Sequence, residues 1–188
     1  MSGGTSESKI MVGGFGGQGV MIIGQLLGYA SCEAGKNSLF LPKYGPEQRG
    51  GTANCTVTIS GEEIGAPSSR KVDVLIALNQ PSLDAFAPAV KAGGMLLINT
   101  SLCKNIPSRS DIAIYGVDSD DIARETGSPK VANIVVIGAY IEKSKILTEE
   151  QIFNAITKKL GRKAELLALN RTALKKGMES VRSLNSPN

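Results

Sequence analysis

The sequence predicts a single α/β domain, and three observations lead to that prediction. Short apolar segments of strand length alternate along the chain with longer segments whose apolar residues recur at helical spacing. A glycine-rich turn, GGFGGQG at residues 13–19, stands between the first strand and the first helix. In it Gly14, Gly16 and Gly19 have the G-x-G-x-x-G spacing of a dinucleotide-binding turn. Together these features predict a Rossmann-like three-layer sandwich around a mostly parallel sheet with a mixed edge.

Six apolar segments are expected to form the strands. Residues 72–78 are almost continuously apolar, which is typical of a central parallel strand. Residues 53–60 alternate and predict a half-buried strand, with a hairpin-like return after Gly61. Pro42 is expected to close the strand before it. The expected strands are 10–12, 38–41, 53–60, 72–78, 95–98 and 112–115.

The expected helices follow from apolar spacing and from their end signals. The first stops before Gly35, and another begins at Pro81, a residue favoured in a first helical turn. Thr148 and Gln151 have the spacing of a capping box. Acidic residues open the helix that starts at Asp118, which suits the helix dipole. The expected helices are 18–34, 81–91, 118–125, 131–143, 148–160 and 163–183.

The length and composition suit one soluble core. A chain of 188 residues with 41% hydrophobic content can bury a full core. We expect a disordered polar tail at 1–9, the domain at 10–183 and a short tail at 184–188. Residues 1–9 do not resemble a signal peptide, no apolar run has membrane-spanning length, and the odd cysteine count suits a reducing compartment. We therefore expect a cytoplasmic protein without a membrane partner.

The net charge of +4 is concentrated in the C-terminal part of the chain. No aromatic residue is interleaved with these cations, and Glu165 and Glu179 interrupt the run, so a nucleic-acid surface is not expected. A solvated helix face, or a face that docks on an acidic partner, is expected instead. The cations are Lys158, Lys159, Arg162, Lys163, Arg171, Lys175 and Lys176.

The residue inventory excludes several kinds of catalytic site. The chain has no histidine, which excludes the usual zinc sites and the Ser-His-Asp and Cys-His arrangements. Cys32, Cys55 and Cys103 form no C-x-x-C motif. We therefore predict no catalytic residue and no metal site on this chain.

The glycine turn lacks the second signal of an NAD site. An acidic residue about 20 positions further on, at the end of the second strand, would bind the ribose. Residues 40–43 contain no acid, Glu33 lies inside the first helix, and Lys43 would attract a phosphate instead. We therefore expect a packing turn and no NAD. The Gln18 amide either lines an interface or ligand or satisfies the backbone of its own loop.

A second polar motif, YGPEQRGGTANC, occupies residues 44–55. Arg49 can bind a carboxylate or a phosphate, and Glu47 can pair with it. The alternative is an internal Arg–Glu clamp that shapes a subunit interface. Further along, Asn79 either caps the next helix or lines an interface.

With these motifs the chain resembles the γ subunit of 2-oxoacid:ferredoxin oxidoreductases. The resemblance rests on GFGGQGV at 14–20, YGPEQRGGTANC at 44–55 and LIALNQPSLDAF at 75–86, and it extends from about residue 9 to 143. It implies a Rossmann-like subunit of an enzyme that oxidatively decarboxylates a 2-oxoacid with coenzyme A. The products are an acyl-CoA, CO2 and reduced ferredoxin.

The same resemblance implies that the cofactors lie on other subunits. The chain has no GDG…NN thiamine motif and no cysteine pattern for an iron–sulfur cluster. Thiamine diphosphate, the clusters and coenzyme A are expected on α, β and ferredoxin-like δ subunits, with ferredoxin as the electron acceptor. The isolated chain is expected to be inactive, and it can dimerise through a surface meant for its partners.

The form of the second motif also suggests a substrate. PEQRGGTANC resembles the 2-oxoglutarate and branched-chain groups, although Gln48 stands where related loops often have Met. We expect 2-oxoglutarate first, a branched-chain 2-oxoacid second and pyruvate third. The alternatives from other classes are a free-standing NAD-dependent enzyme and a Rossmann nucleotide-binding module.

Two walls of one site are expected at the carboxyl edge of the sheet, facing the catalytic subunits. This edge is expected to touch the coenzyme A or thiamine diphosphate region. The first wall is Gly16, Gly17, Gln18 and Gly19, and the second is Glu47, Arg49, Thr52 and Asn54.

Overall fold

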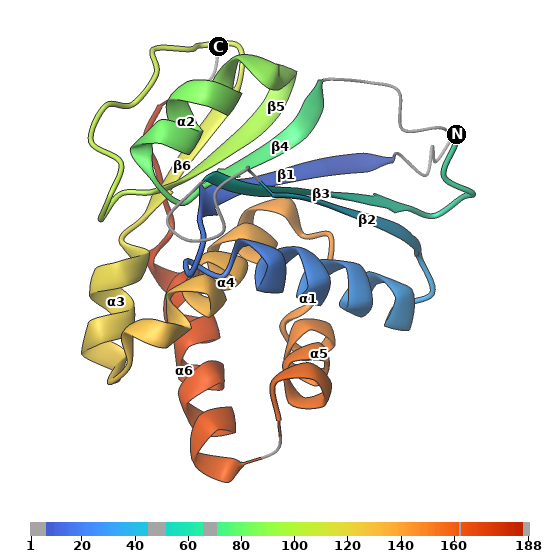
Figure 1. Ribbon diagram of the computed structural model, residues 1–188, viewed down its shortest axis with the longest axis vertical. Helices are drawn as coiled ribbons and strands as arrows, with labels where there is room; N and C mark the ends of the chain where they lie inside the picture. Colours follow the sequence, from blue (N-terminus) through green and yellow to red (C-terminus); the bar gives the residue numbers. More distant parts are fainter. Residues whose placement is uncertain (1–6, 45–51, 66–70, 162, 186–188) are drawn as a thin grey trace.

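A mixed sheet forms the centre of the computed structural model, which describes residues 7–44, 52–65, 71–161 and 163–185. In these ranges seven strands lie in the order β2-β3-β1-β4-β5-β6-β7 (Figure 1). The pairs β1–β4, β4–β5 and β5–β6 are parallel, and the pairs β2–β3, β1–β3 and β6–β7 are antiparallel. The predicted α/β class is confirmed, and the mixed pairing occurs at both edges. The strands are β1 (Ser8–Phe15), β2 (Asn37–Tyr44), β3 (Thr52–Ser60), β4 (Val72–Ala77), β5 (Val90–Asn99), β6 (Ala113–Val117) and β7 (Arg182–Ser183).

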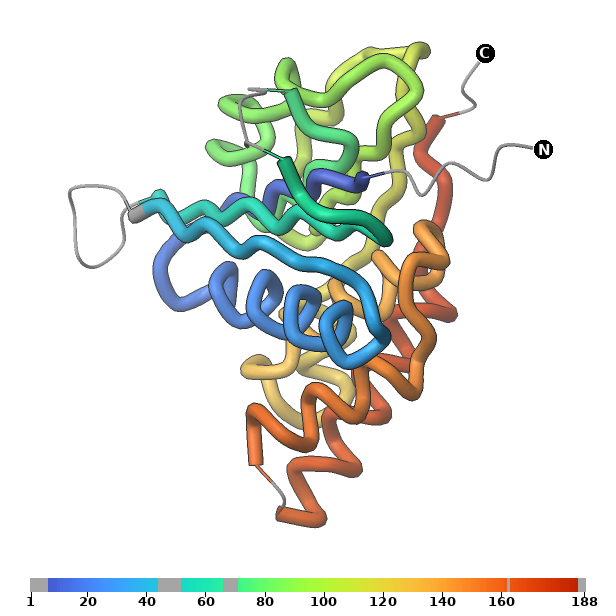
Figure 2. Tube along the Cα trace, turned by 90° about the vertical axis from the view of Figure 1, so that its right-hand side faces the viewer, coloured from blue at the N-terminus to red at the C-terminus, as the bar shows by residue number. Residues whose placement is uncertain are grey.

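The helices cover the two faces of the sheet unequally. Figure 1 shows α1 and α4 against one face, with α5 and α6 further out, and α2 on the other face. Figure 2, seen after a quarter turn, shows α5 and α6 extending away from the sheet. The helices are α1 (Val20–Glu33), α2 (Gln80–Phe86), α3 (Ser119–Thr126), α4 (Ala132–Ser144), α5 (Glu149–Leu160) and α6 (Ala164–Ser180), with short 3-10 turns η1 (Ala87–Ala89) and η2 (Pro129–Val131).

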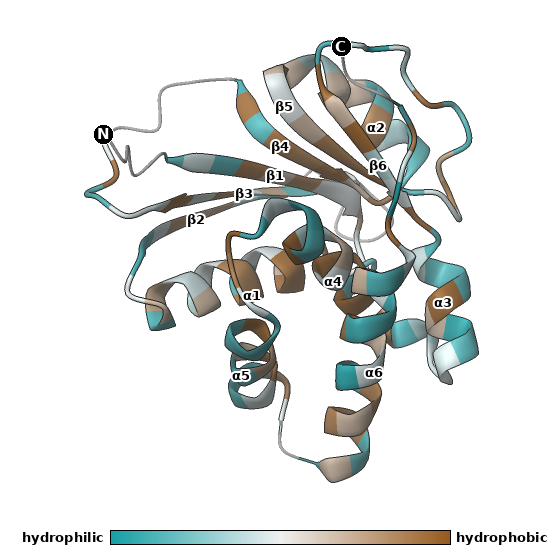
Figure 3. Cartoon of the chain, turned by 180° about the vertical axis from the view of Figure 1, so that it is seen from behind, coloured by the Kyte–Doolittle hydropathy of each residue, from teal (hydrophilic) through white to brown (hydrophobic). Residues whose placement is uncertain are grey.

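Helix α4 is the central helix of the larger core. Every residue from Asn133 to Ile141 is buried, because the sheet lies on one side of the helix and α6 on the other. Figure 3 shows the contrast between this mostly hydrophobic helix and α3 and α6, in which hydrophilic and hydrophobic residues alternate. A helix that is apolar nearly all round needs such complete coverage.

Glycines let α4 and α6 approach until their backbones touch. A Cβ atom on Gly138 would lie 2.1 Å from the Leu174 carbonyl oxygen, and one on Gly177 would lie 2.0 Å from the Val135 carbonyl oxygen. Both distances are far below any van der Waals contact, so no larger residue fits at this crossing. The pair of glycines therefore fixes the distance between the two helices.

The first three strands are longer than the sequence predicts. Gly13 and Gly14 belong to β1, because β3 pairs with β1 as far as Phe15 opposite Thr52. Pro42 does not close β2, which continues to Tyr44, because an edge strand tolerates a residue without an N–H.

Strand β3 is buried on both faces rather than half-buried. Thr56 and Thr58 are only 6% and 2% exposed, because β3 lies between β2 and β1 and the larger side chains of those strands flank its threonines. No strand follows Gly61 within residues 61–65, so the expected hairpin-like return is wrong.

Two predicted helix ends are also wrong. Helix α2 ends at Phe86 and passes through η1 into β5 at Val90, because Pro88 cannot continue an α-helix. The last helix ends at Ser180, and residues 182–183 form β7, which pairs with β6 and adds an antiparallel strand to the second edge.

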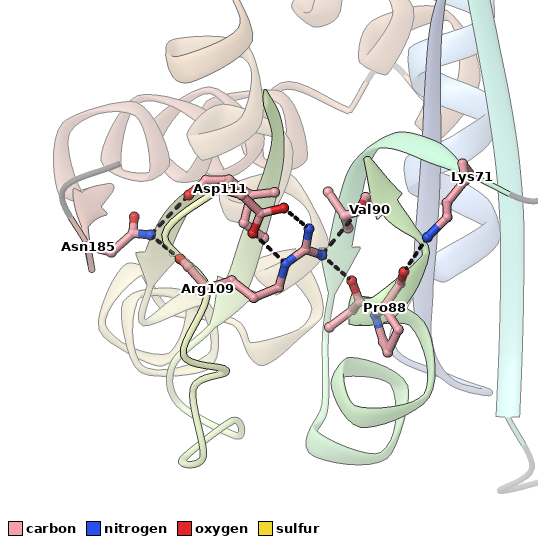
Figure 4. Close-up of polar contacts among 8 residues, drawn as sticks. Lys71, Pro88, Val90, Arg109, Asp111 and Asn185 are labelled. Carbon is pink, nitrogen blue, oxygen red and sulfur yellow. Dashed lines mark hydrogen bonds and ion pairs between the residues drawn. The ribbon is translucent and has the colours of Figure 1, made fainter. Parts of the chain in front are cut away.

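Beyond β7, the Asn185 side chain holds the C-terminal segment and the loop before β6 together. Its Nδ2 donates to the carbonyl oxygens of Arg109 at 2.9 Å and Ile112 at 3.0 Å, and its Oδ1 accepts from the Ile114 N–H at 2.8 Å. Figure 4 shows this amide at the Arg109 backbone, whereas the Arg109 guanidinium points away from Asn185 and bonds Asp111 and the carbonyl oxygen of Val90. The loop is thereby tied to both β5 and β7.

Replacing Asn185 with alanine is expected to lower the free energy of unfolding by about 2 kcal/mol, because three hydrogen bonds are lost. Chemical denaturation followed by circular dichroism measures the change. Asn154→Ala on the exposed face of α5 is the matched control and should change stability by less than about 0.5 kcal/mol. Equal stability of the two variants would show that the Asn185 contacts contribute nothing.

Candidate functional site

The glycine turn after β1 is held by one of its own side chains. Gln18 Oε1 accepts hydrogen bonds from the Phe15 N–H at 2.7 Å and from Asn79 Nδ2 at 2.9 Å. Gln18 Nε2 approaches the Leu78 carbonyl oxygen at 3.5 Å. The amide thus satisfies the backbone of its own loop, one of the two roles predicted for it, and ties the turn to the end of β4.

Two asparagines fix the ends of the neighbouring strands. Asn79 follows β4 and caps α2, since its Oδ1 accepts from the Ser82 N–H at 2.9 Å; the predicted cap is confirmed. Asn99 ends β5, and its Nδ2 donates to the Leu78 carbonyl oxygen at 3.2 Å and to Asp120 Oδ2 at 2.6 Å. Amide side chains therefore link the turn, β4, β5 and α3 along the carboxyl edge.

Gly19 lets the start of α4 approach the turn. Its φ is 82°, in the left-handed region that favours glycine. A Cβ atom there would also lie 2.7 Å from Asn133 Nδ2, on the first turn of α4. The third glycine of the motif is thus required by both its backbone conformation and a close side-chain contact.

A cavity of about 340 Å³ opens between the glycine turn and the starts of α3 and α4. Parallel strands end at this edge, and the helices that follow them present their N-termini here, where free N–H groups favour negative charge. Its polar lining residues are Gln18, Asn99, Ser119, Asp120, Lys130 and Asn133.

Two buried polar atoms in this lining have no hydrogen-bond partner among the described residues. Asn133 is 8% exposed and its Oδ1 is unpaired, and Ser119 is 1% exposed and its Oγ is unpaired. Buried polar groups are nearly always satisfied, so each unpaired one calls for an explanation. Both residues line the cavity, so the two unpaired atoms belong to its wall.

The structure places the first predicted wall at the cavity but only part of the second wall. Gly17, Gln18 and Gly19 line the cavity, and Gly16 stands beside them in the turn. Thr52 is exposed on β3 directly opposite Phe15, next to the turn but outside the cavity lining. Asn54 pairs with Gly13 further along β3. Glu47 and Arg49 lie outside the described residues.

The order of the strands in the sheet differs from that of a dinucleotide-binding fold. In such folds the second strand lies beside the first, which brings its terminal acid to the ribose. Here β3 lies between β1 and β2, so the end of β2 is one strand further from the turn. That end carries Lys43 and Tyr44 rather than an acid. This topology removes the ribose contact of such a site, and the absence of NAD binding stays a prediction.

Sequence reasoning missed Asn99, Ser119, Asp120 and Asn133. Asn99 was detectable, because it is a polar residue directly after a predicted buried strand, at the edge where sites form. Ser119 and Asn133 begin helices, where polar residues usually serve as caps. Only the packed structure shows that both residues line a cavity and that their buried side-chain oxygens have no partner among the described residues.

The described residues do not fit a metal or cluster site. Within residues 7–44, 52–65, 71–161 and 163–185, no group of three or more His, Cys, Asp or Glu side chains could hold a metal ion. Burial raises the pKa of the Cys55 thiol to about 12, and burial with the nearby Asp84 carboxylate raises the pKa of Cys103 to about 12. The two thiols also lie in separate hydrophobic clusters of the core, so they do not come together as a ligand set.

The helices of this part of the chain also differ from membrane spans. No helix among the described residues combines the length and the apolar character needed to cross a bilayer.

Comparison with curated proteins identifies relatives over almost the whole chain. Ketoisovalerate oxidoreductase subunit VorA of Methanothermobacter thermautotrophicus is 40% identical over 177 residues, which cover 94% of this chain and 37% of VorA. 2-Oxoglutarate synthase subunit KorC of Methanocaldococcus jannaschii is 34% identical over 181 residues, 95% of this chain and 96% of KorC. The chain therefore spans 37% of the first relative and nearly all of the second.

A solved structure and a family model point to the same group of proteins as these relatives. The γ subunit of the keto/oxoacid ferredoxin oxidoreductase from Geobacter sulfurreducens superposes with a TM-score of 0.82 at 28% identity, covering 93% of this chain and 96% of that one. The family described as pyruvate ferredoxin/flavodoxin oxidoreductase matches residues 9–180. From the predicted motifs, the fold and this match, the chain belongs to the pyruvate ferredoxin/flavodoxin oxidoreductase family.

Proposed function

We propose that this chain is the γ subunit of a 2-oxoacid:ferredoxin oxidoreductase that converts a 2-oxoacid and coenzyme A into an acyl-CoA, CO2 and reduced ferredoxin. One observation carries the proposal: the chain is coextensive with separate subunits of such enzymes. It covers 96% of the KorC relative and 96% of the Geobacter γ subunit. The α and β subunits and ferredoxin are its proposed partners, in the cytoplasm.

The substrate is proposed to be 2-oxoglutarate or a branched-chain 2-oxoacid. The PEQRGGTANC motif supports both, with 2-oxoglutarate first. The identities favour the opposite order, because VorA, a ketoisovalerate oxidoreductase subunit, is 40% identical against 34% for KorC, so both acids are tested below. Pyruvate is third, with the Thermotoga maritima PorC relative at 30% identity.

The contribution of this chain is proposed to lie at its carboxyl edge. The cavity of about 340 Å³ is near the lower limit for small-molecule sites, so it can take one end of coenzyme A but not the whole molecule. Asn133 Oδ1 would accept a donor there, and the helix starts would favour a negatively charged group. Bound on the partners, thiamine diphosphate would supply the decarboxylation chemistry, and iron–sulfur clusters would carry the electrons.

Co-expression with candidate α and β subunits tests the proposal. The assay is reduction of a viologen dye that depends on coenzyme A, with 2-oxoglutarate, 3-methyl-2-oxobutanoate and pyruvate compared. Activity is expected only when this chain is present, and one of the first two acids should give the highest kcat/KM. Full activity of the α and β subunits without this chain would contradict the proposal.

The competing NAD-dependent function is tested on the isolated chain. Calorimetric titration with NAD is expected to give no binding signal, because the strand order and the missing acid remove the ribose contact. Saturable binding at micromolar NAD would favour the free-standing enzyme instead.

A further inference from the structure

A second and larger cavity lies at the opposite, amino edge of the sheet. Its volume is about 600 Å³, and it shares no lining residue with the cavity beside the glycine turn. It is bounded by Ser8 at the start of β1, Asp73 near the start of β4 and the C-terminal turn of α4. The carboxyl-edge site does not explain this cavity, and none of the sequence motifs marks it.

A buried hydroxyl in its lining lacks a partner. Tyr140 is 0% exposed, and its Oη makes no hydrogen bond within the described part of the chain. The Ser8 and Ser144 hydroxyls, which also line the cavity, are its polar neighbours. Burial raises the pKa of Tyr140, so the phenol keeps its proton and can donate it to a hydrogen bond. Ser8, Ser144 and Tyr140 therefore form a group of hydroxyls at this end of the cavity.

The cavity carries an excess of positive charge. Lys36, Lys91 and Lys143 line it, against one carboxylate, Asp73. Asp73 is already engaged, because its Oδ1 accepts from Lys91 Nζ at 2.9 Å and its Oδ2 accepts from the Lys9 N–H at 2.8 Å. The carboxylate is therefore neutralised by its own neighbours.

The other two lysines form no ion pair with a carboxylate among the described residues. Lys36 Nζ donates to the Ile146 carbonyl oxygen at 2.7 Å, and Lys143 Nζ lies 5.1 Å from the centre of the Tyr115 ring. Two cations without a carboxylate partner beside this group of hydroxyls favour an anion in the cavity.

Most of the remaining side chains in the lining are apolar, which narrows the kind of anion. Ile59, Val74, Met95 and Ile146 contribute hydrocarbon, and Ser60 is a further polar residue. A bare inorganic ion would leave that surface in contact with water, whereas a carboxylate with a hydrocarbon body would cover it. The charge and the apolar surface therefore select the same class of ligand.

We propose that this cavity binds a small carboxylate with an apolar body. The carboxylate lies between Lys36 and Lys143, the Tyr140 hydroxyl donates to one of its oxygens, and the hydrocarbon chain packs on Met95 and Ile146. The site is separate from the edge proposed to meet the catalytic subunits, so it remains a property of this chain whichever 2-oxoacid the complex uses.

Calorimetric titration of the full-length chain with hexanoate, hexan-1-ol and inorganic phosphate tests the proposal. Hexanoate is expected to bind at least about tenfold more tightly than either of the others, because hexan-1-ol lacks the carboxylate and phosphate lacks the hydrocarbon chain. Lys143→Gln and Lys36→Gln should each weaken hexanoate binding about tenfold, the effect of one lost charge-assisted hydrogen bond. Lys163→Gln, at the start of α6, is the matched control and should leave binding unchanged.

The variant Tyr140→Phe measures the contribution of the phenol hydroxyl separately from that of the lysines. It removes only the hydroxyl, and hexanoate affinity is expected to fall about fivefold while circular dichroism stays that of the parent. The proposal is overturned if hexanoate shows no saturable binding, if hexan-1-ol or phosphate binds as tightly, or if both lysine variants bind hexanoate like the parent. The lysine variants decide the matter even if Tyr140→Phe does not fold.

Discussion

Replacing Gly177 with alanine is expected to lower the free energy of unfolding by about 3 kcal/mol, at the upper end of the usual cost of overpacking. The new methyl group would lie 2.0 Å from the Val135 carbonyl oxygen. The obstacle is backbone on α4 rather than a side chain that can rotate, so α6 must move away and open the larger core. Chemical denaturation gives the change in stability directly.

The control is the same substitution where only a side chain is near. A Cβ atom on Gly28 in α1 would have the Ser38 Oγ at 3.1 Å and Val57 Cγ1 at 3.9 Å as its nearest neighbours. Gly28→Ala should change stability by less than about 1 kcal/mol, since improved helix propensity offsets the contact. If Gly177→Ala is as stable as the parent, the helices do not cross as closely as described.

Gln18→Ala is expected to lower both stability and the activity of the assembled complex. The Phe15 N–H and the Asn79 Nδ2 would lose their shared acceptor, at a cost of about 2 kcal/mol. The turn would then move relative to the cavity, and small displacements near a reacting centre reduce rates by about 100-fold. Viologen reduction by the co-expressed complex, measured below the unfolding temperature of the variant, is expected to fall at least about tenfold.

A second Gln→Ala variant separates the effect of lower stability from the effect of moving the glycine turn. Gln151 belongs to the capping box of α5, where its Oε1 accepts from the Thr148 N–H at 2.9 Å. Gln151→Ala should cost about 1 kcal/mol but leave the complex active, because α5 is not part of the carboxyl edge. Equal activity of the Gln18 and Gln151 variants would show that the turn has no special place in the complex.

Local patterns predicted the class of fold and most elements. The capping box at Thr148, the Asn79 cap and the apolar run of β4 each act through neighbours in sequence, so they were readable before the structure. Long-range pairing could not be read in this way. Gly13 and Gly14 look like a turn in isolation and become strand only because β3 pairs beside them.

The candidate site likewise has a part that local sequence patterns predict and a part that depends on long-range packing. The glycine turn was predicted from its spacing, but the cavity beside it depends on where α3 and α4 begin in space. Asn133 is an ordinary helix residue in sequence, and its contact with Gly19 joins positions more than a hundred residues apart. The short β7 was missed because two residues carry no periodicity, and only its pairing with β6 defines it.

Hydrogen–deuterium exchange of this chain, alone and in the assembled complex, tests the central claim that the carboxyl edge meets the catalytic subunits. The prediction is strong protection in the complex at residues 16–19 and at the starts of α3 and α4, with little change at residues 91–94 and 143–146 beside the amino-edge cavity. Protection confined to the amino edge, with the glycine turn exchanging as in the free chain, would contradict the claim.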